Sequence, residues 1–369
     1  MSQIRHVLGI SGGKDSAALA IYIKQRYPTL DIDYYTCDTG KELDDTYRLI
    51  DNLEVYLGKK IKVLKAVQHP DENPFDFHLK LKGGYLPSSI IRWCTQKLKL
   101  EPFEQYVGTD PVVSYVGIRG DEKREGYISK KSNIQSIFPF RKNIWSEDVI
   151  RKVLNIANIE RLMDLYVSID LENKSQRFEE LLMSPIEFSF SMDHKLHLLL
   201  DTNVKDFNRL VFACLKDTDY PLSGEQYFPL IENDEILVKE DIFRILEESG
   251  VGIPGYYRKL GFEVDNQKGE YSRSRSGCYF CFFQQRIEWV WLYEQHPEMF
   301  YKAMEYEKDG YTWGQNESLE ELIKPERIAQ IKLEHLQKIS GKRTASPLLT
   351  NILDDEEDEE EVGCAVCQI

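Results

Sequence analysis

The chain has 369 residues, of which 42% are hydrophobic and 30% are charged. These fractions are typical of a globular protein with room for one large α/β domain and a smaller helical part. The formal net charge is −15, and eight of the acids are consecutive at positions 354–361, so the rest of the chain is only mildly acidic. This balance argues against a protein that grips nucleic acid by bulk charge, although a local basic patch or a partner could still deliver it.

No window approaches the roughly 18 uninterrupted apolar residues that span a bilayer, and positions 1–6 lack the apolar run of a secretory signal. We therefore expect a cytoplasmic protein with no membrane contact. The seven cysteines include two close pairs, Cys278 with Cys281 and Cys364 with Cys367. In a reducing compartment this spacing favours metal or redox chemistry over structural disulfides.

Short apolar runs alternate with helical patterns over the first 120 residues. The runs lie at 7–10, 32–37, 61–67 and 112–117, and the helical patterns lie near 16–25, 43–57 and 95–106. Buried strands separated by helix-length segments predict an α/β fold with a Rossmann-like, doubly wound, mainly parallel sheet. The ligand crevice of such a sheet lies at the carboxyl ends of its strands.

A glycine-rich loop, Ser-Gly-Gly-Lys-Asp-Ser at 11–16, joins the first predicted strand to the first predicted helix. Adjacent glycines let backbone N–H groups converge on phosphate oxygens, and the helix presents its positive N-terminal end. The Walker spacing is absent. The loop is instead similar to the pyrophosphate loop (PP-loop) of N-type ATP pyrophosphatases and phosphoadenylylsulfate reductases. This resemblance implies that ATP or an adenylyl sulfate is bound by Ser11, Gly12, Gly13, Lys14, Asp15 and Ser16.

Two further elements carry the same resemblance. Asp38, Thr39 and Gly40 end the second predicted strand and resemble the element that lies against the adenosine in phosphoadenylylsulfate reductase-like proteins. Residues 116–124 resemble the Gly-x-Arg-x-x-Glu-Ser element of that family. Arg119 in this element offers a planar, permanently charged fork to a phosphate or sulfate, with a surface ion pair as the alternative role.

The Cys-x-x-Cys segment at 278–281, called the cysteine turn below, is the second strong indication of function. Cys278 and Cys281 follow Ser-Gly, which suits thiolate ligation of zinc or an iron–sulfur cluster. Cys94 begins a basic helix, where Lys97 and Lys99 would favour its thiolate. The resemblance to the reductase-like fold implies that Cys94 is a third ligand beside Cys278 and Cys281. We expect a [4Fe–4S] cluster with one open iron in preference to zinc, with a redox dithiol as an alternative.

Beyond residue 142 the composition changes to a leucine-rich, helix-forming stretch. We expect a nucleotide-binding core at 1–142, a helical insertion at 143–222, a return to the core at 223–285 with an α/β-like run over 227–254, a helical part at 286–345 and a flexible acidic tail at 346–369. The aromatic residues at 289–301 favour a core stripe over a base-stacking surface. The tail cysteines, Cys364 and Cys367, either deliver a thiol or persulfide to the active site or have no role.

Within this superfamily, the Cys-x-x-Cys turn and the large insertion most resemble the sulfur-transfer ATP pyrophosphatases of bacterial DNA phosphorothioation systems, which serve in antiviral defence. The resemblance implies adenylylation of a DNA backbone phosphate by ATP with Mg²⁺, followed by sulfur transfer. It also implies a cysteine desulfurase and other proteins of the system as partners. Lys14, Asp15 and Arg119 are the expected catalytic residues. The alternatives are a phosphoadenylylsulfate reductase that releases sulfite and a catalytically silent nucleotide sensor.

Overall fold

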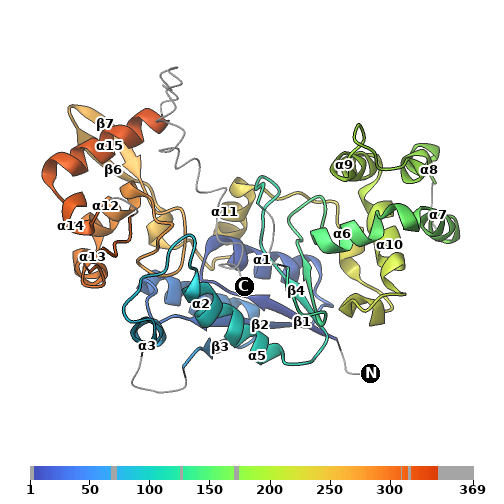
Figure 1. Ribbon diagram of the computed structural model, residues 1–369, viewed down its shortest axis with the longest axis horizontal. Coiled ribbons are helices and arrows are strands. Elements are labelled where there is room, and N and C mark those ends of the chain that lie inside the picture. The colour runs from blue at the N-terminus through green and yellow to red at the C-terminus, as the bar shows by residue number, and fades with distance from the viewer. Residues whose placement is uncertain are drawn as a thin grey trace.

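The computed structural model describes residues 4–67, 73–124, 128–169, 174–308, 310–314 and 317–339. At its centre lies a five-stranded parallel sheet with the order β3-β2-β1-β4-β5 (Figure 1). Its strands are β1 (Arg5–Gly9), β2 (Ile32–Asp38), β3 (Lys62–Lys65), β4 (Val112–Tyr115) and β5 (Ile134–Ile137). The predicted α/β class with a Rossmann-like parallel sheet is confirmed. The four expected apolar runs correspond to β1 to β4, and β5 is an additional strand.

The helices, in chain order, are α1 (Lys14–Arg26), α2 (Asp44–Leu57), α3 (Pro74–Leu81), α4 (Trp93–Thr95), α5 (Glu101–Val107), α6 (Glu147–Val153), α7 (Ile159–Ser168), α8 (Gln176–Met183), α9 (Met192–Thr202), α10 (Val204–Leu215), α11 (Lys239–Glu248), α12 (Arg286–Gln295), α13 (Pro297–Met304), α14 (Leu319–Leu322) and α15 (Pro325–Ile339). A π-helical segment, Gln96–Leu100, joins α4 to α5. Among the described helices, none has both the length and the apolar character that crossing a bilayer requires.

Helices cover both faces of the sheet because alternate side chains of each strand point to opposite faces. Leu8 of β1 pairs with Tyr34 of β2 and Tyr115 of β4, and all three side chains lie in one core with α1 and α2. The neighbouring positions Val7 and Tyr35 lie in a second core with α5. The sheet is therefore doubly wound, and the loops that follow its strands share one edge.

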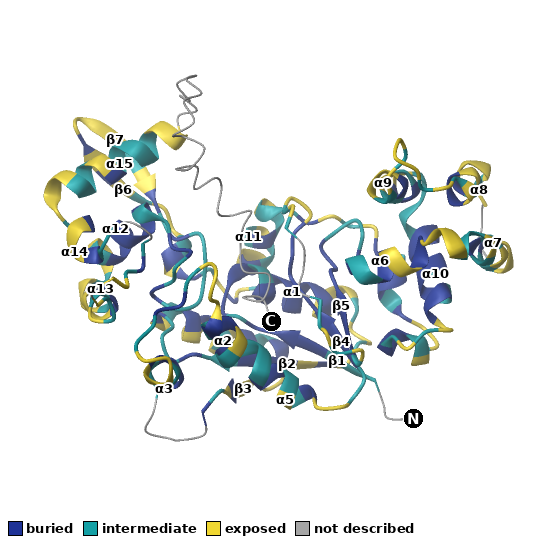
Figure 2. Cartoon of the chain, in the orientation of Figure 1, coloured by how far each residue is buried: buried dark blue, intermediate teal, exposed yellow. Residues whose placement is uncertain are grey.

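Two helical bodies flank the sheet at opposite ends of the molecule (Figure 1). Helices α6 to α10 occupy the segment in which the sequence predicts a helical insertion. Helices α12 to α15 lie at the other end, with β6 (Leu260–Val264) and β7 (Gln267–Tyr271), which form a separate antiparallel hairpin. Figure 2 shows that buried residues are concentrated around the sheet and along the inner sides of both bodies.

The segment 227–254 differs from the expected α/β-like run. Its described backbone contains a 3-10 turn at Pro229–Glu232 and helix α11 but no strand. The proline begins a tight turn because its ring fixes φ, and the apolar residues of α11 recur at helical spacing. Helix α11 packs along α1, so this segment lies against the helices that cover the central sheet.

The aromatic residues near the C-terminal helices form a core, as the sequence predicts. Trp289, Trp291 and Phe300 are buried in a cluster with the hairpin and with α13 to α15. Tyr301 is exposed at its edge. The tail cysteines, Cys364 and Cys367, lie outside the described residues.

Candidate active site

The backbone of the phosphate loop is closely packed and takes a conformation that favours glycine. Gly12 has a φ of +72°, and a Cβ at this position would lie 2.2 Å from Cγ2 of Thr46. The Tyr256 hydroxyl donates to the Gly12 carbonyl at 2.9 Å. Gly13 is the N-cap of α1 and makes no side-chain hydrogen bond, and the Lys14 amide donates to the Tyr257 hydroxyl at 3.4 Å, so the N-terminal end of this helix lies at the pocket that Gly13, Lys14 and Tyr257 line.

The two serines of the loop form hydrogen bonds within the loop that stabilise its conformation. The Ser16 hydroxyl accepts from the Ser11 amide at 3.2 Å and donates to the Gly13 carbonyl at 3.3 Å. The Ser11 and Ser16 hydroxyls lie 3.1 Å apart. Ser16 therefore shapes the loop, whereas Ser11 also faces the pocket.

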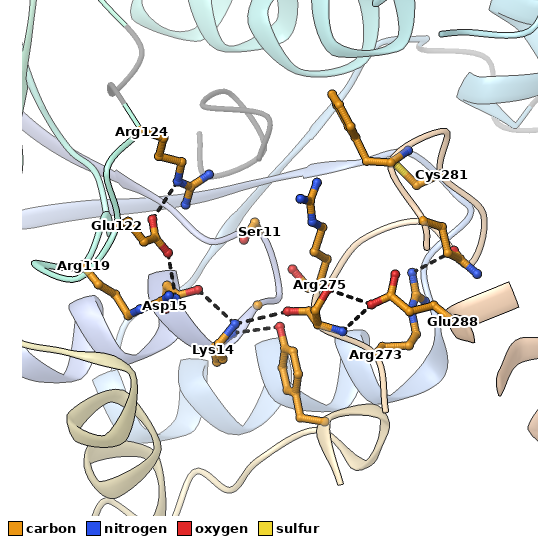
Figure 3. A pocket seen from close by; sticks show the side chains of 16 residues that line it. Ser11, Lys14, Asp15, Arg119, Glu122, Arg124, Arg273, Arg275, Cys281 and Glu288 are labelled. Carbon is orange, nitrogen blue, oxygen red and sulfur yellow. Dashed lines mark hydrogen bonds and ion pairs between the residues drawn. The ribbon is translucent and has the colours of Figure 1, made fainter. Parts of the chain in front are cut away.

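The loop opens into a pocket built from segments far apart in the sequence (Figure 3). Its lining residues are Ser11, Gly13, Lys14, Asp15, Arg119, Glu122, Arg124, Tyr257, Arg273, Ser274, Arg275, Ser276, Cys281, Phe283, Gln284 and Glu288. Five of these side chains are cationic and three are carboxylates. The resulting excess of positive charge suits anionic ligands such as phosphates.

Lys14 lies at the centre of this arrangement. Its side chain is buried, and its Nζ donates to the Ser274 carbonyl at 3.2 Å. The same atom lies 3.4 Å from Oδ2 of Asp15 and 4.9 Å from the centre of the Tyr257 ring. The ammonium is therefore held beside the phosphate loop by Asp15 of the same loop and by Tyr257 and Ser274 from much later in the chain.

Asp15 and Arg119 form a buried ion pair next to Lys14, with 3.0 Å between Oδ1 and Nη1. Burial raises the pKa of the Asp15 carboxyl, but the charges of Lys14 and Arg119 outweigh burial and hold the pKa below its ordinary value. Arg119 also pairs with Asp121 at 2.8 Å and Glu122 at 2.7 Å. The structure thus brings Arg119 to the pocket, as expected of an anion clamp, but with its guanidinium already engaged by three carboxylates.

The end of β2 lies beside the cysteine turn. The Thr39 hydroxyl lies 3.1 Å from Sγ of Cys278 and donates to Oε1 of Glu42 at 2.5 Å. Glu42 and Cys278 form an isolated antiparallel bridge. Asp38 accepts from the Gly40 amide at 2.8 Å, which closes the turn. The expected adenosine residues, 38–40, are thus next to the pocket but do not line it.

The three expected metal ligands are only partly brought together. Burial, with the charge of Glu42, raises the pKa of the Cys278 thiol far above its usual range, and Cys94 is near enough to add to this shift. Cys281 instead lines the pocket, and its Sγ accepts from the Phe283 amide at 3.4 Å.

Within the described part of the chain, no group of three His, Cys, Asp or Glu side chains is placed to hold a metal ion. As placed here, Cys94, Cys278 and Cys281 do not fit a metal cluster. The [4Fe–4S] cluster, like zinc, therefore stays a prediction, and we derive no chemistry through it.

Several pocket residues are not among the residues predicted from the sequence. Arg273 and Arg275 flank Ser274, and the Ser274 amide and hydroxyl both donate to Oε1 of Glu288, at 2.6 and 2.7 Å. In the sequence these residues precede the cysteine turn without a motif of their own. Their proximity to the conspicuous Ser-Gly-Cys string was the one available signal.

A doubly wound parallel sheet whose first loop opens into a cationic pocket has the arrangement expected of a phosphate-binding site. Residues 5–159 match the family model described as the phosphoadenosine phosphosulfate reductase domain. This part of the chain is thus similar to that domain, which supports the predicted resemblance to PP-loop and reductase-like proteins. An uncharacterized protein of Methanocaldococcus jannaschii is 33% identical over 145 residues, which are 36% of this chain and 28% of the archaeal protein. The chain therefore spans less than a third of the length of that relative.

Proposed function

We propose that this protein is an ATP pyrophosphatase that activates a nucleic-acid backbone phosphate for sulfur insertion, as in DNA phosphorothioation. The observation that carries the proposal is that Cys281 lines the same cationic pocket as Lys14 of the phosphate loop. A thiol and a phosphate-binding loop in one pocket allow phosphate activation and sulfur transfer to follow each other without release of the activated intermediate.

In the first step, an oxygen of the acceptor phosphate attacks the α-phosphorus of ATP. The bond between the α-phosphorus and the bridging oxygen breaks, and pyrophosphate leaves. Lys14 and the positive N-terminal end of α1 stabilise the charge that develops on the leaving group. Asp15 and Glu122 supply carboxylate oxygens of the kind that, with ATP phosphates, hold Mg²⁺, and the ion when bound neutralises the same charge.

In the second step, sulfur at the oxidation level of sulfide attacks the adenylylated phosphorus. A P–S bond forms, the P–O bond to AMP breaks, and AMP leaves. A cysteine desulfurase is the proposed source, which delivers the sulfur as a persulfide. A second thiol attacks the cysteine sulfur of this persulfide, so that a disulfide forms and the outer sulfur leaves as sulfide. An external thiol then reduces the disulfide. The partner, the DNA acceptor and a cytoplasmic setting are parts of this proposal.

A phosphoadenylylsulfate reductase is the second candidate, and the description of the matching family model favours it. In that reaction a thiolate attacks the sulfonyl sulfur, the adenosine bisphosphate leaves, and a second thiol releases sulfite. The pocket could hold this substrate too, because an adenylyl sulfate presents phosphate and sulfate groups to the same cations.

Product analysis distinguishes the two reactions. Full-length protein purified without oxygen is incubated with Mg-ATP, a short DNA duplex and sulfide, and separately with phosphoadenylyl sulfate and a thiol. Pyrophosphate and AMP from the first mixture support the pyrophosphatase, and phosphorothioate in the recovered DNA identifies the acceptor. Sulfite from the second mixture, with no pyrophosphate from the first, replaces the proposal with the reductase. Lys14→Ala protein is the control for contaminating activity in both.

A further inference from the structure

Two arginines beside Cys281 in the pocket have buried donors for which the described residues offer no hydrogen-bond partner. Arg273 is 3% exposed, and its Nη2 donates to the Cys278 carbonyl at 3.0 Å and to Oε1 of Gln284 at 3.4 Å. Its Nε and Nη1 have no hydrogen-bond partner among the residues that the structure describes, and neither does the buried Nη2 of Arg275. Buried polar groups are paired in the great majority of cases, and buried charged donors almost always are.

The cations at the phosphate loop are in a different situation. Arg119 is ion-paired with Asp15, Asp121 and Glu122, and Lys14 contacts Asp15 and the Ser274 carbonyl. These cations belong to a network that is already neutralised by carboxylates. The arginines on the cysteine side have no ion pair with any carboxylate among the described residues, although Glu288 lines the same pocket.

Glu288 is committed to the protein backbone. Its Oε1 accepts from the Ser274 amide and hydroxyl, and its Oε2 accepts from the Gln285 amide at 3.0 Å. It thereby caps α12 and fixes the segment between the two arginines. Three of its roughly four acceptor positions serve this role, and none of its hydrogen bonds or ion pairs within the described part of the chain goes to Arg273 or Arg275.

The two arginines are also held in position relative to the phosphate loop. The guanidinium of Arg273 lies 5.9 Å from the centre of the Tyr256 ring, and the Tyr256 hydroxyl donates to the Gly12 carbonyl. The guanidinium of Arg275 lies 5.3 Å from the centre of the Phe283 ring. Figure 3 shows Arg275 reaching into the space between Ser11 and Cys281. The donors are thus preorganised beside the thiol.

We infer that Arg273 and Arg275 form a second oxyanion subsite, separate from the phosphate loop, that holds the phosphodiester of the sulfur acceptor beside Cys281. This inference rests on the proposed function. Guanidinium groups suit a phosphate because their planar N–H donors match two of its oxygens. With the nucleotide phosphates on the loop, this subsite places the acceptor phosphate between ATP and the thiol.

The test uses the full chain with its phosphate loop occupied by a saturating ATP analogue that has a methylene group between the α- and β-phosphorus. A short labelled oligonucleotide is titrated, and its affinity is compared between wild type and Arg275→Gln. We expect Arg275→Gln to weaken oligonucleotide binding by about tenfold or more while the affinity for the analogue changes less than about twofold. Arg275 is mutated first because Arg273 also supports the cysteine turn.

Arg177→Gln is the matched control. Arg177 lies on α8 with 62% of its side chain exposed, and it pairs only loosely with Glu180 at 3.6 Å. The Arg177→Gln variant removes the same charge from the chain. An equal loss of oligonucleotide affinity in this variant would therefore mean that net charge, and not the subsite, governs binding. An unchanged affinity in Arg275→Gln, or an equal loss for analogue and oligonucleotide, overturns the inference.

A second measurement separates this inference from the proposed reaction. Inorganic sulfate is added to the analogue-bound protein, and the melting temperature is followed. Sulfate that stabilises wild type but not Arg275→Gln supports the subsite even if ATP yields no pyrophosphate. Equal stabilisation of both proteins overturns the subsite even if ATP does yield pyrophosphate. If Arg275→Gln instead weakens only the binding of a nucleotide that carries a 3′-phosphate, the arginines bind the nucleotide and the inference fails.

Discussion

The Nζ of Lys14 donates to the carbonyl oxygen of Ser274 at 3.2 Å, although the two residues are 260 positions apart in the chain. Ser274 in turn donates through its amide and hydroxyl to Glu288 at the start of α12. The phosphate loop, the segment before the cysteine turn and the C-terminal helices are thus one hydrogen-bonded unit. The proposed phosphate activation and the proposed sulfur transfer both depend on this contact between the phosphate loop and the segment before the cysteine turn.

Replacing Lys14 with alanine is expected to abolish most nucleotide turnover and to leave the fold intact. Loss of one charged donor to a leaving group lowers the rate by about 100-fold or more. The matched control is Lys24→Ala on the same helix, because Lys24 is exposed and donates to the Tyr56 and Leu57 carbonyls away from the pocket. Steady-state rates and circular dichroism check both variants. Full turnover by Lys14→Ala would remove the loop from the mechanism.

Gly12→Ala is expected to lose stability and nucleotide binding together. The positive φ alone costs about 1 kcal/mol with an L side chain, and the new Cβ would meet Thr46 at 2.2 Å. Gly58→Ala isolates the first of these effects, because Gly58 has a φ of +67° and nothing within 4 Å of the added carbon. Urea unfolding should show a larger loss for Gly12→Ala than for Gly58→Ala. Equal losses would mean that the loop relaxes around the methyl group.

The central sheet could be predicted because four of its strands are short apolar runs between helical patterns. The fifth strand could not, because Gln135 and Ser136 interrupt its two isoleucines. Both polar side chains are nevertheless buried, and Oε1 of Gln135 accepts from the Leu222 amide at 3.1 Å. This hydrogen-bond partner of Gln135 is 87 residues away in the sequence. The local sequence pattern around the strand therefore gives no indication that its polar side chains can be buried.

The pocket residues likewise divide into those that a local sequence pattern reveals and those that depend on distant segments of the chain. Ser11, Lys14 and Asp15 could be located because they form a contiguous motif with a known kind of chemistry. Arg273 and Arg275 could not, because their placement depends on the β6–β7 hairpin, which returns the chain so that the Arg273 amide donates to the Tyr256 carbonyl at 2.9 Å. The predicted ligand set of three cysteines depends on distant segments in the same way.

Asp15→Asn should change the pH dependence of stability. The pKa of Asp15 is lowered in the folded protein from an ordinary value of 3.8, so its charge stabilises the fold above about pH 4, and this contribution is lost as the pH falls through the lowered pKa. At pH 7 we expect Asp15→Asn to reduce the free energy of unfolding by about 3 kcal/mol, because Lys14 and Arg119 lose a buried partner. The difference from wild type should shrink toward pH 3.

Urea unfolding at a series of pH values measures this effect. Asp201→Asn is the control, because Asp201 pairs with Lys142 at the surface and should cost little at any pH. A destabilisation of Asp15→Asn that is constant from pH 7 to pH 3 would show that hydrogen bonding, and not the charge of Asp15, stabilises the pocket.

Lys195 offers a test of whether the helical insertion and the pocket are energetically separate. Its side chain is 1% exposed, and its Nζ donates to the carbonyls of Leu182 and Ser184 at 2.7 and 2.8 Å, at the end of α8. Burial lowers the pKa of this ammonium group. Lys195→Met keeps the aliphatic volume but leaves both carbonyls without their donor. We expect a loss of about 2 kcal/mol in the free energy of unfolding.

Nucleotide turnover of Lys195→Met should equal that of wild type below the unfolding transition, because none of the residues that line the pocket belongs to helices α6 to α10, which form one end of the molecule (Figure 1). Lys205→Met is the matched control, since Lys205 pairs with Asp234 and its side chain is 42% exposed. Reduced turnover in Lys195→Met at a temperature where it remains folded would show that the insertion helps to shape the active site. Unchanged stability would instead show that water replaces the ammonium at the end of α8.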